Sequence, residues 1–220
     1  MMRASLIHIE KLTLAHPGKM LYENLGFELY RGDCIMLCGA NGSGKTSLLR
    51  ALANISGETE TVMIPTKIPK IPGFTLQDFI RISCYRQSDR TGQLSAHDCE
   101  TMLYAMKRLG IADLAGRDIS TLSDGEFQKG CIATALVRNA ELILLDEPTA
   151  FLDPQNRKSV LHTLRSLCRE ANPPAIIFST HDLADGLEVC NRVIALGKQF
   201  TITPPESDKA TLRLAAENIF

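Results

Sequence analysis

The chain has 220 residues, of which 45% are hydrophobic and 22% are charged, and its formal net charge at pH 7 is −1. These values exclude disordered and fibrous classes, and the near-zero charge argues against a large basic surface for nucleic acid. The apolar runs are too short to span a membrane, and the first one is broken by charged residues, so we expect neither a membrane helix nor a signal peptide. The seven cysteines include no CxxC pair, which favours buried thiols in a reducing compartment.

Short apolar runs alternate with helical patterns along the chain, as in a parallel sheet covered by helices. Strands are predicted at residues 34–38, 142–145, 175–178 and 193–196, with helices over 45–53 and 154–170. The stretch 65–73 is different, because Pro65, Pro69, Pro72 and Gly73 exclude a long regular element there. Helices are predicted near 75–83, 98–109 and 125–138, with no strand between them. We therefore expect a single domain over 1–220, an α/β core with a helical insertion at about 67–138.

A glycine-rich segment, Gly39-Ala40-Asn41-Gly42-Ser43-Gly44-Lys45-Thr46, follows the first of these buried strands and matches the phosphate-loop pattern in full. Glycines let backbone N–H groups turn toward phosphate oxygens, and the helix that follows points its positive end at the same charge. Lys45 can reach the β- and γ-phosphates, and the Thr46 hydroxyl can coordinate Mg²⁺. The predicted ATP-binding residues here are Gly39, Asn41, Gly42, Ser43, Gly44, Lys45, Thr46 and Ser47.

Polar residues also follow two other predicted strands. Asp146 and Glu147 come directly after Leu142–Leu145, and His181 follows the strand that ends near Phe178. Because ligand sites of such sheets lie at the carboxyl ends of the strands, these side chains are expected to face the phosphate loop. Asp146 is suited to hold Mg²⁺, Glu147 to act as general base for an attacking water, and His181 to donate to a γ-phosphate.

These residues, in this order, resemble one family, the ATP-binding cassette (ABC) ATPases. Leu122-Ser123-Asp124-Gly125-Glu126 is similar to the family's signature motif, usually Leu-Ser-Gly-Gly-Gln, and residues 148–153 are similar to the segment leading into its D-loop. The resemblance implies an α/β fold: a P-loop NTPase core with a mainly parallel sheet, a small antiparallel N-terminal β lobe and a helical subdomain. It also implies a head-to-tail sandwich of two copies, in which Ser123, Asp124, Gly125 and Glu126 complete the partner's ATP site. By the same resemblance, Asp153 lines the dimer seam.

The chain departs from the family pattern at several positions. Asp124 and Glu126 replace a glycine and a glutamine of the signature, which places two acids near an expected polyphosphate. His16 takes the place of the aromatic residue that stacks on adenine. Two residues compete for the place of the Q-loop glutamine: Thr66, after Met63-Ile64-Pro65, and Gln87.

The helical insertion resembles that of one subgroup of importers. Residues 73–79 and 92–98 are similar to the helical subdomain of the iron-siderophore, haem and cobalamin importer ATPases. This implies an ATPase that uses ATP and Mg²⁺, binds an integral-membrane permease, and lies in the cytoplasm on the inner face of the cell membrane, with no nucleic-acid partner. The apolar set Met102, Leu103, Met106 and Leu109 is either a core face or part of the permease contact.

The rival interpretations are a small exporter-type ATPase of the haem-export or cytochrome-maturation class, a non-transport ABC ATPase, and a P-loop kinase. A DNA-repair or chromosome-clamp ATPase needs a long coiled coil, for which the short helices between Lys45 and Asp146 leave no room. A P-loop kinase would lack the signature motif.

Overall fold

The computed structural model describes residues 5–16, 18–84, 94–217 and 219. The chain divides into two compact units. The first contains Met1–Thr66, Glu141–Ala150 and Leu161–Phe220, and the second contains Lys67–Ala140 and Phe151–Val160.

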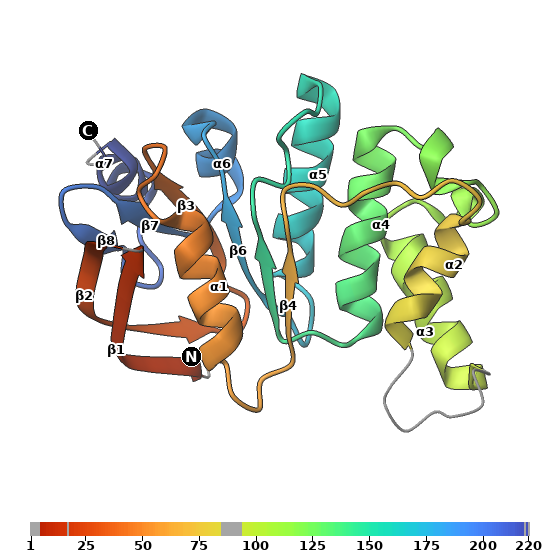
Figure 1. The fold of residues 1–220 in the computed structure, drawn as a ribbon, viewed down its shortest axis with the longest axis horizontal. Coiled ribbons are helices and arrows are strands. Elements are labelled where there is room, and N and C mark those ends of the chain that lie inside the picture. Colours follow the sequence, from red (N-terminus) through yellow and green to blue (C-terminus); the bar gives the residue numbers. More distant parts are fainter. Residues whose placement is uncertain (1–4, 17, 85–93, 218, 220) are drawn as a thin grey trace. The chain divides into compact units, whose positions relative to one another are not determined.

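The first unit is built on a six-stranded sheet with the strand order β4-β5-β6-β3-β7-β8 (Figure 1). Every neighbouring pair is parallel except β7 and β8, which are antiparallel. The strands are β3 (Cys34–Gly39), β4 (Thr61–Ile64), β5 (Leu142–Leu145), β6 (Ala175–Ser179), β7 (Arg192–Leu196) and β8 (Phe200–Ile202). This mixed α/β arrangement confirms the predicted fold class.

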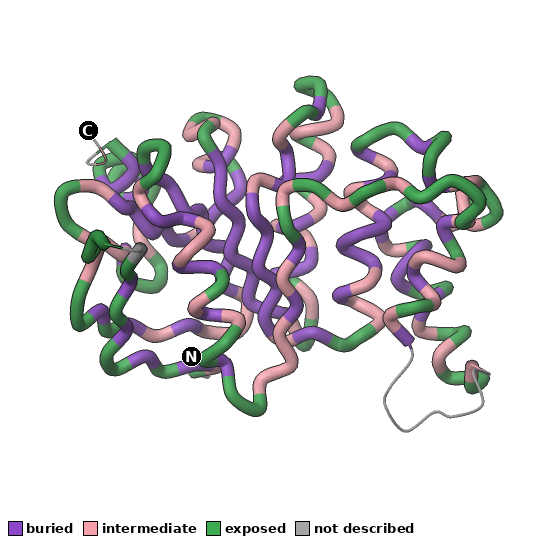
Figure 2. Tube along the Cα trace, in the orientation of Figure 1, coloured by how far each residue is buried: buried purple, intermediate pink, exposed green. Residues whose placement is uncertain are grey.

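The four central strands, β3, β5, β6 and β7, are buried at every residue (Figure 2). Continuous apolar runs of this kind are typical of parallel strands that are covered on both faces, which is why the sequence predicted all four. The two edge strands, β4 and β8, are only partly buried. Their short, mixed sequences give a weak hydrophobic signal, so the apolar runs alone did not predict them.

A second, two-stranded antiparallel sheet joins β1 (Ser5–His16) to β2 (Lys19–Tyr30). Its register shifts at several points. Its buried side chains alternate with exposed ones, as expected for a sheet with one face exposed to solvent. Leu12, Leu14 and Phe27 belong to the same buried cluster as Leu48 and Leu49 of α1 (Lys45–Ile55). The small antiparallel N-terminal lobe is therefore confirmed.

A buried ion pair ties the start of β7 to the turn before β3. Arg192 Nη1 lies 2.6 Å from Asp33 Oδ2, and the two side chains are 4% and 0% exposed. The guanidinium also donates to the carbonyl oxygens of Glu28 and Thr203. A buried charge is tolerated only when it is paired and hydrogen-bonded, and here both conditions hold.

The remaining helices of the first unit follow β6 and β8. They are α6 (Leu183–Val189) and α7 (Lys209–Glu217). Asp182 caps α6 by accepting a hydrogen bond from the backbone N–H of Asp185.

The second unit is helical, with α2 (Leu76–Arg81), α3 (Ala96–Arg108) and α4 (Asp124–Val137). Short 3₁₀ turns occupy Ile82–Cys84, Ala112–Leu114 and Ile119–Thr121. All three α-helices begin with a capping box, in which Thr75, Ser95 or Ser123 exchanges hydrogen bonds with an acidic residue three positions later.

Most of the apolar set on α3 belongs to the core of this unit. Met102, Met106 and Leu109 are buried, whereas Leu103 is 48% exposed. α5 (Pro154–Leu167) begins in the second unit and ends in the first. It is shorter than the predicted 154–170, because the chain turns at Arg169 and Glu170 before the prolines that precede β6.

Candidate functional site

The phosphate loop lies between β3 and α1, and its glycines are required by its geometry. Gly42 and Gly44 have φ angles of 76° and 102°, a left-handed conformation that other residues rarely adopt. A Cβ on Gly39 would lie 2.5 Å from Ser43 Oγ and 2.8 Å from the carbonyl oxygen of Leu196. The loop therefore keeps its turn only with glycine at these positions.

Lys45 is the first residue of α1, and its side chain is held by the loop itself. Its Nζ donates to the carbonyl oxygen of Gly39 at 2.9 Å and to that of Ala40 at 3.3 Å. Burial lowers the pKa of Lys45, although the charges of Glu147 and Asp146 oppose this effect. A partly desolvated cation on a loop of backbone N–H groups is suited to bind an anion.

Ser43 supplies a second indication that this loop is shaped for a ligand. Its hydroxyl oxygen is buried and has no hydrogen-bond partner among the described residues. Buried polar groups are usually paired, so an orphaned hydroxyl in a phosphate loop fits a site that gains an oxygen-rich ligand. Asn41 and Gly42 are exposed at the tip of the loop, and Thr46 and Ser47 are half-buried at the start of α1.

Asp146, directly after β5, is held from both sides by hydroxyl groups. Thr46 Oγ1 donates to Asp146 Oδ2 at 2.8 Å, and Ser179 Oγ donates to Asp146 Oδ1 at 2.9 Å. The sequence predicted that Asp146 faces the phosphate loop and holds Mg²⁺ together with Thr46, and the structure brings these two side chains together. Ser179, the last residue of β6, was not singled out in the sequence, although a polar residue at the end of a buried apolar strand is a usable signal.

Ser179 also fixes the backbone of the next acid. The N–H of Glu147 donates to Ser179 Oγ at 2.7 Å. Glu147 has a φ angle of 50°, which is strained for a residue with a side chain, and such strain often occurs at functional sites. The side-chain oxygen Oε1 of Glu147 lies 2.6 Å from His181 Nε2. Two of the three residues predicted to be catalytic, Glu147 and His181, are therefore in direct contact, and Lys45 is the third.

The residues around Asp146 also fit a magnesium ion. Mg²⁺ is usually held by one or two protein oxygens together with phosphate oxygens and water, rather than by a cage of protein ligands. Thr46 and Asp146 offer such a pair of oxygens beside the phosphate loop. Within the described residues, no group of three or more His, Cys, Asp or Glu side chains could hold a metal. The pair formed by Thr46 and Asp146 matches an ion that arrives with a phosphate ligand.

The signature residues lie in the second unit, at the start of α4. Ser123 is the N-cap residue of this helix, and its N–H and hydroxyl groups both donate to Glu126 Oε2, at 2.8 and 2.9 Å. These bonds lower the pKa of Glu126. Asp124 forms an ion pair with Lys70, whose Nζ lies 2.7 Å from Asp124 Oδ1. The sequence did not predict a role for Lys70, because nothing local connects it to α4.

A hollow of about 390 Å³, called here the signature hollow, opens beside these residues. Its lining consists of Leu122, Ser123, Asp124, Gly125, Phe151, Leu152, Asp153 and Asn156. Gly125 is packed closely, since a Cβ there would lie 2.9 Å from the Asn156 side chain. Asp153 accepts hydrogen bonds from the backbone N–H groups of Gln155 and Asn156 and from the Asn156 side chain, which lower its pKa.

The positions of three further predicted residues do not test the roles predicted for them. His16 is the last residue of β1 and pairs with Lys19 of β2. Thr66 follows β4 and Pro65 and is half-buried. Gln87 lies outside the described residues. Thr66 and Gln87 both stay predictions for the place of the Q-loop glutamine.

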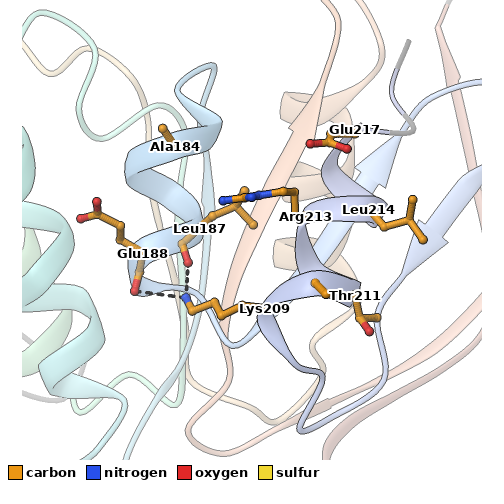
Figure 3. Close-up of a pocket in the computed structure, with 9 residues that line it drawn as sticks. Ala184, Leu187, Glu188, Lys209, Thr211, Arg213, Leu214 and Glu217 are labelled. Atoms are coloured by element: carbon orange, nitrogen blue, oxygen red, sulfur yellow. Dashed lines mark hydrogen bonds between the residues drawn. The ribbon is translucent and has the colours of Figure 1, made fainter.

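A separate pocket of about 880 Å³ lies between α6 and α7 (Figure 3). Its lining carries two basic and two acidic side chains, those of Lys209, Arg213, Glu188 and Glu217. Lys209 Nζ donates to the carbonyl oxygens of Leu187 and Glu188 at the end of α6, as Figure 3 shows. None of the predicted site residues lines this pocket.

Comparison with known proteins identifies the family. The family model described as "ABC transporter" matches residues 22–150, which include the phosphate loop, the signature residues and both acids after β5. This chain belongs to the ABC transporter family. It is an ATP-binding subunit, and subunits of this kind are ATPases that couple hydrolysis to transport through a membrane permease.

Several relatives of this ABC transporter ATPase are named for the import or the transport of a solute. The molybdate import ATP-binding protein MolC of Haemophilus influenzae is 30% identical, over 88% of this chain and 79% of its own length. The achromobactin transport ATP-binding protein CbrD of Dickeya dadantii is also 30% identical, over 84% of this chain and 77% of its own. The phosphonates import ATP-binding protein PhnC of Stutzerimonas stutzeri is 29% identical, over 86% of this chain and 80% of its own.

Solved structures of ABC transporters share the fold. An inward-facing transporter described as metal-chelate type superimposes with a TM-score of 0.84 at 25% identity, covering 97% of this chain and 88% of its own. A nucleotide-free ATP-binding cassette superimposes with a TM-score of 0.82 at 15% identity, covering 98% of both chains. In the part of this ABC transporter ATPase that the structure describes, no helix combines the length and apolarity needed to cross a membrane.

Proposed function

We propose that this ABC transporter ATPase powers the import of a metal chelate, of the iron-siderophore, haem or cobalamin class, through a partner permease. The similarity to a metal-chelate type transporter structure supports this class, as do relatives named for the siderophores achromobactin and petrobactin. The resemblance of residues 73–79 to the helical subdomain of such importers points the same way. Relatives named for phosphonate and molybdate import make an oxyanion importer the second candidate.

The single observation that carries the enzymatic part is the polar network at the ends of β5 and β6. In this proposal the phosphate loop binds the ATP phosphates, with Lys45 as the cation that contacts them and Thr46 and Asp146 as the residues that hold Mg²⁺. The ion, when bound, would neutralise part of the phosphate charge. Ser179 keeps Asp146 and the backbone of Glu147 in place for this task.

Hydrolysis then proceeds by in-line attack of water on the γ-phosphorus. Glu147 Oε1 accepts a proton from the attacking water, the new P–O bond forms, and the bond between the γ-phosphorus and the bridging oxygen of the ADP leaving group breaks. His181, whose Nε2 lies 2.6 Å from Glu147 Oε1, positions this carboxylate, and in the ATP complex that we propose the same ring nitrogen donates to the γ-phosphate instead. In the dimer that we propose, Ser123 and Gly125 of a second copy complete the site, and Asp153 lines the seam.

Several exposed apolar side chains of the second unit support a permease contact there. Exposed apolar side chains mark an interaction site where they form a contiguous patch, and such a patch is what a permease contact here requires. The exposed side chains are Ile71, Phe74, Ile82, Leu103 and Tyr104. Bound in this way, the subunit would lie peripherally on the inner face of the membrane.

Two experiments test this function. Replacing the general base, Glu147→Gln, is expected to keep ATP binding and to lower turnover at least about 100-fold, within the usual range for general-base catalysis. Steady-state hydrolysis at the wild-type rate in this variant would refute the role of Glu147.

The transported solute is tested with the assembled transporter in liposomes, with its permease and binding protein. Hydrolysis stimulated by ferric siderophore, haem or cobalamin is expected. Stimulation by phosphonate or molybdate alone would replace the metal-chelate class with an oxyanion.

A further inference from the structure

The signature of this chain carries negative charge where the proposed function requires a polyphosphate to bind. Asp124 is the first residue of α4, its side chain is 61% exposed, and it lines the signature hollow together with Ser123 and Gly125. The positive end of a helix attracts anions, but an adjacent carboxylate works against that attraction. An unpaired Asp124 would therefore weaken the site that the dimer needs.

Lys70 lies against this carboxylate, and other contacts fix it there. Its Nζ is 2.7 Å from Asp124 Oδ1 and also donates to the carbonyl oxygen of Leu122 at 2.8 Å. The same nitrogen lies 5.6 Å from the centre of the Phe127 ring, within the range of a cation–π contact. The Lys70 side chain is only 23% exposed, so it is the more buried partner of the ion pair. The position of Lys70 thus determines where the Asp124 carboxylate is held.

The other acid of the signature is engaged differently. Glu126 accepts two hydrogen bonds from Ser123, and its other oxygen, Oε1, lies 3.9 Å from Arg117 Nη1. It is tied into the capping box of α4, whereas Lys70 is the cation that pairs with Asp124 among the residues that the structure describes. Lys70 is therefore the group whose removal would leave one signature carboxylate uncompensated.

We propose that Lys70 is a positioning residue that neutralises Asp124 and holds its carboxylate in place, so that the acidic signature can receive the polyphosphate of a second copy. This inference rests on the proposed ATP-sandwich function. Lys70 acts through Asp124, and the proposal requires no contact between Lys70 and the nucleotide. The effect of removing Lys70 should consequently depend on whether Asp124 is present.

The test measures ATP-driven self-association of the full chain in the Glu147→Gln background, where hydrolysis is suppressed. Light scattering with size-exclusion chromatography gives the Mg-ATP concentration that half-converts monomer to dimer. Lys70→Ala is expected to raise this concentration about tenfold, as for the loss of one charge-assisted interaction. Lys70→Arg should stay within about threefold of the parent, since it keeps the charge.

The decisive comparison repeats Lys70→Ala in an Asp124→Gly background. There the lysine has no carboxylate to neutralise, and its removal should change the half-conversion concentration less than about twofold. Lys158→Ala, which removes an exposed lysine of α5 that is not paired with Asp124, is the matched charge control and should behave like the parent. Thermal denaturation of each variant shows whether it folds.

The outcomes separate the inference from the function on which it rests. If ATP drives association of the parent and Lys70→Ala has the same effect with and without Asp124, or none at all, the positioning role is wrong while the sandwich stands. If the parent does not associate at any ATP concentration, the proposed sandwich and this inference both fail. A loss that appears only when Asp124 is present supports the role of Lys70.

Discussion

Replacing Ser179 with alanine tests whether the polar network at the ends of β5 and β6 is needed for turnover. The side chain of Ser179 is fully buried, and its hydroxyl joins two groups: it accepts from the N–H of Glu147 and donates to Asp146 Oδ1. Alanine removes one oxygen and leaves both groups without this partner. Asp146 keeps the hydrogen bond from Thr46 and loses only the one from Ser179.

The size of the effect follows from these contacts. Leaving a buried donor unsatisfied costs about 1–3 kcal/mol, and losing a bond to a charged acceptor costs a similar amount. Because a water molecule could replace part of the lost hydrogen bonding, we expect the free energy of unfolding to fall by about 2–4 kcal/mol. Glu147 would also lose the bond that fixes its strained backbone, and kcat should fall about 10–100-fold, the scale of misplacing a catalytic group.

The assay pairs urea denaturation with steady-state hydrolysis of ATP. Ser56→Ala is the matched control, because it removes a buried serine hydroxyl that donates to the carbonyl oxygen of Ala53, away from the acids. The control should lose about 1 kcal/mol of stability and keep its kcat. If Ser179→Ala loses stability but keeps the wild-type kcat, the network is structural and our account of Glu147 is wrong.

Two further predictions concern the buried charges. Arg192→Leu is expected to lower the free energy of unfolding, measured in urea, by about 3–5 kcal/mol, because it leaves Asp33 buried without its cation. Adding Asp33→Asn should recover a large part of the lost stability. A double variant no more stable than Arg192→Leu would contradict this explanation. Burial lowers the pKa of Lys45 in the folded chain below its ordinary value of 10.5. Between these two pKa values the unfolded chain binds more protons than the folded chain, so the free energy of unfolding rises with pH. Lys45→Met should remove this rise from thermal denaturation curves, raise the stability of the nucleotide-free protein, and weaken ATP binding; an unchanged pH profile would contradict it.

The strands that carry the site were predictable, because each is largely an apolar run, and Asp146 and Glu147 follow one of them directly. The apolar run Leu142–Leu145 indicates a buried strand, and Asp146 follows it directly. In a parallel sheet the carboxyl ends of neighbouring strands lie at the same edge. The phosphate loop was predictable for another reason, since its glycines are required by backbone geometry rather than by distant neighbours.

The contacts of Ser179 and Lys70 could not be predicted in the same way. Ser179 acts through residues of a neighbouring strand, and its role depends on the register that places Leu145 beside Phe178. Lys70 lies 54 positions before Asp124, in a segment whose prolines remove any periodic signal. Such pairings depend on how distant segments fold together, which local patterns do not encode.

The acid at position 126 shows how a departure from a family pattern can preserve local structure and change only charge. Glu126 accepts hydrogen bonds from the N–H and hydroxyl of Ser123, and a glutamine could accept them through its amide oxygen. The start of α4 is therefore expected to keep the same capped geometry with either residue. What differs is a negative charge beside the signature hollow, and Arg117 and Lys70 are the cations that the fold brings to this end of the helix. On the proposed function, cations from elsewhere in the second unit would offset the charge of an acidic signature when it receives a polyphosphate.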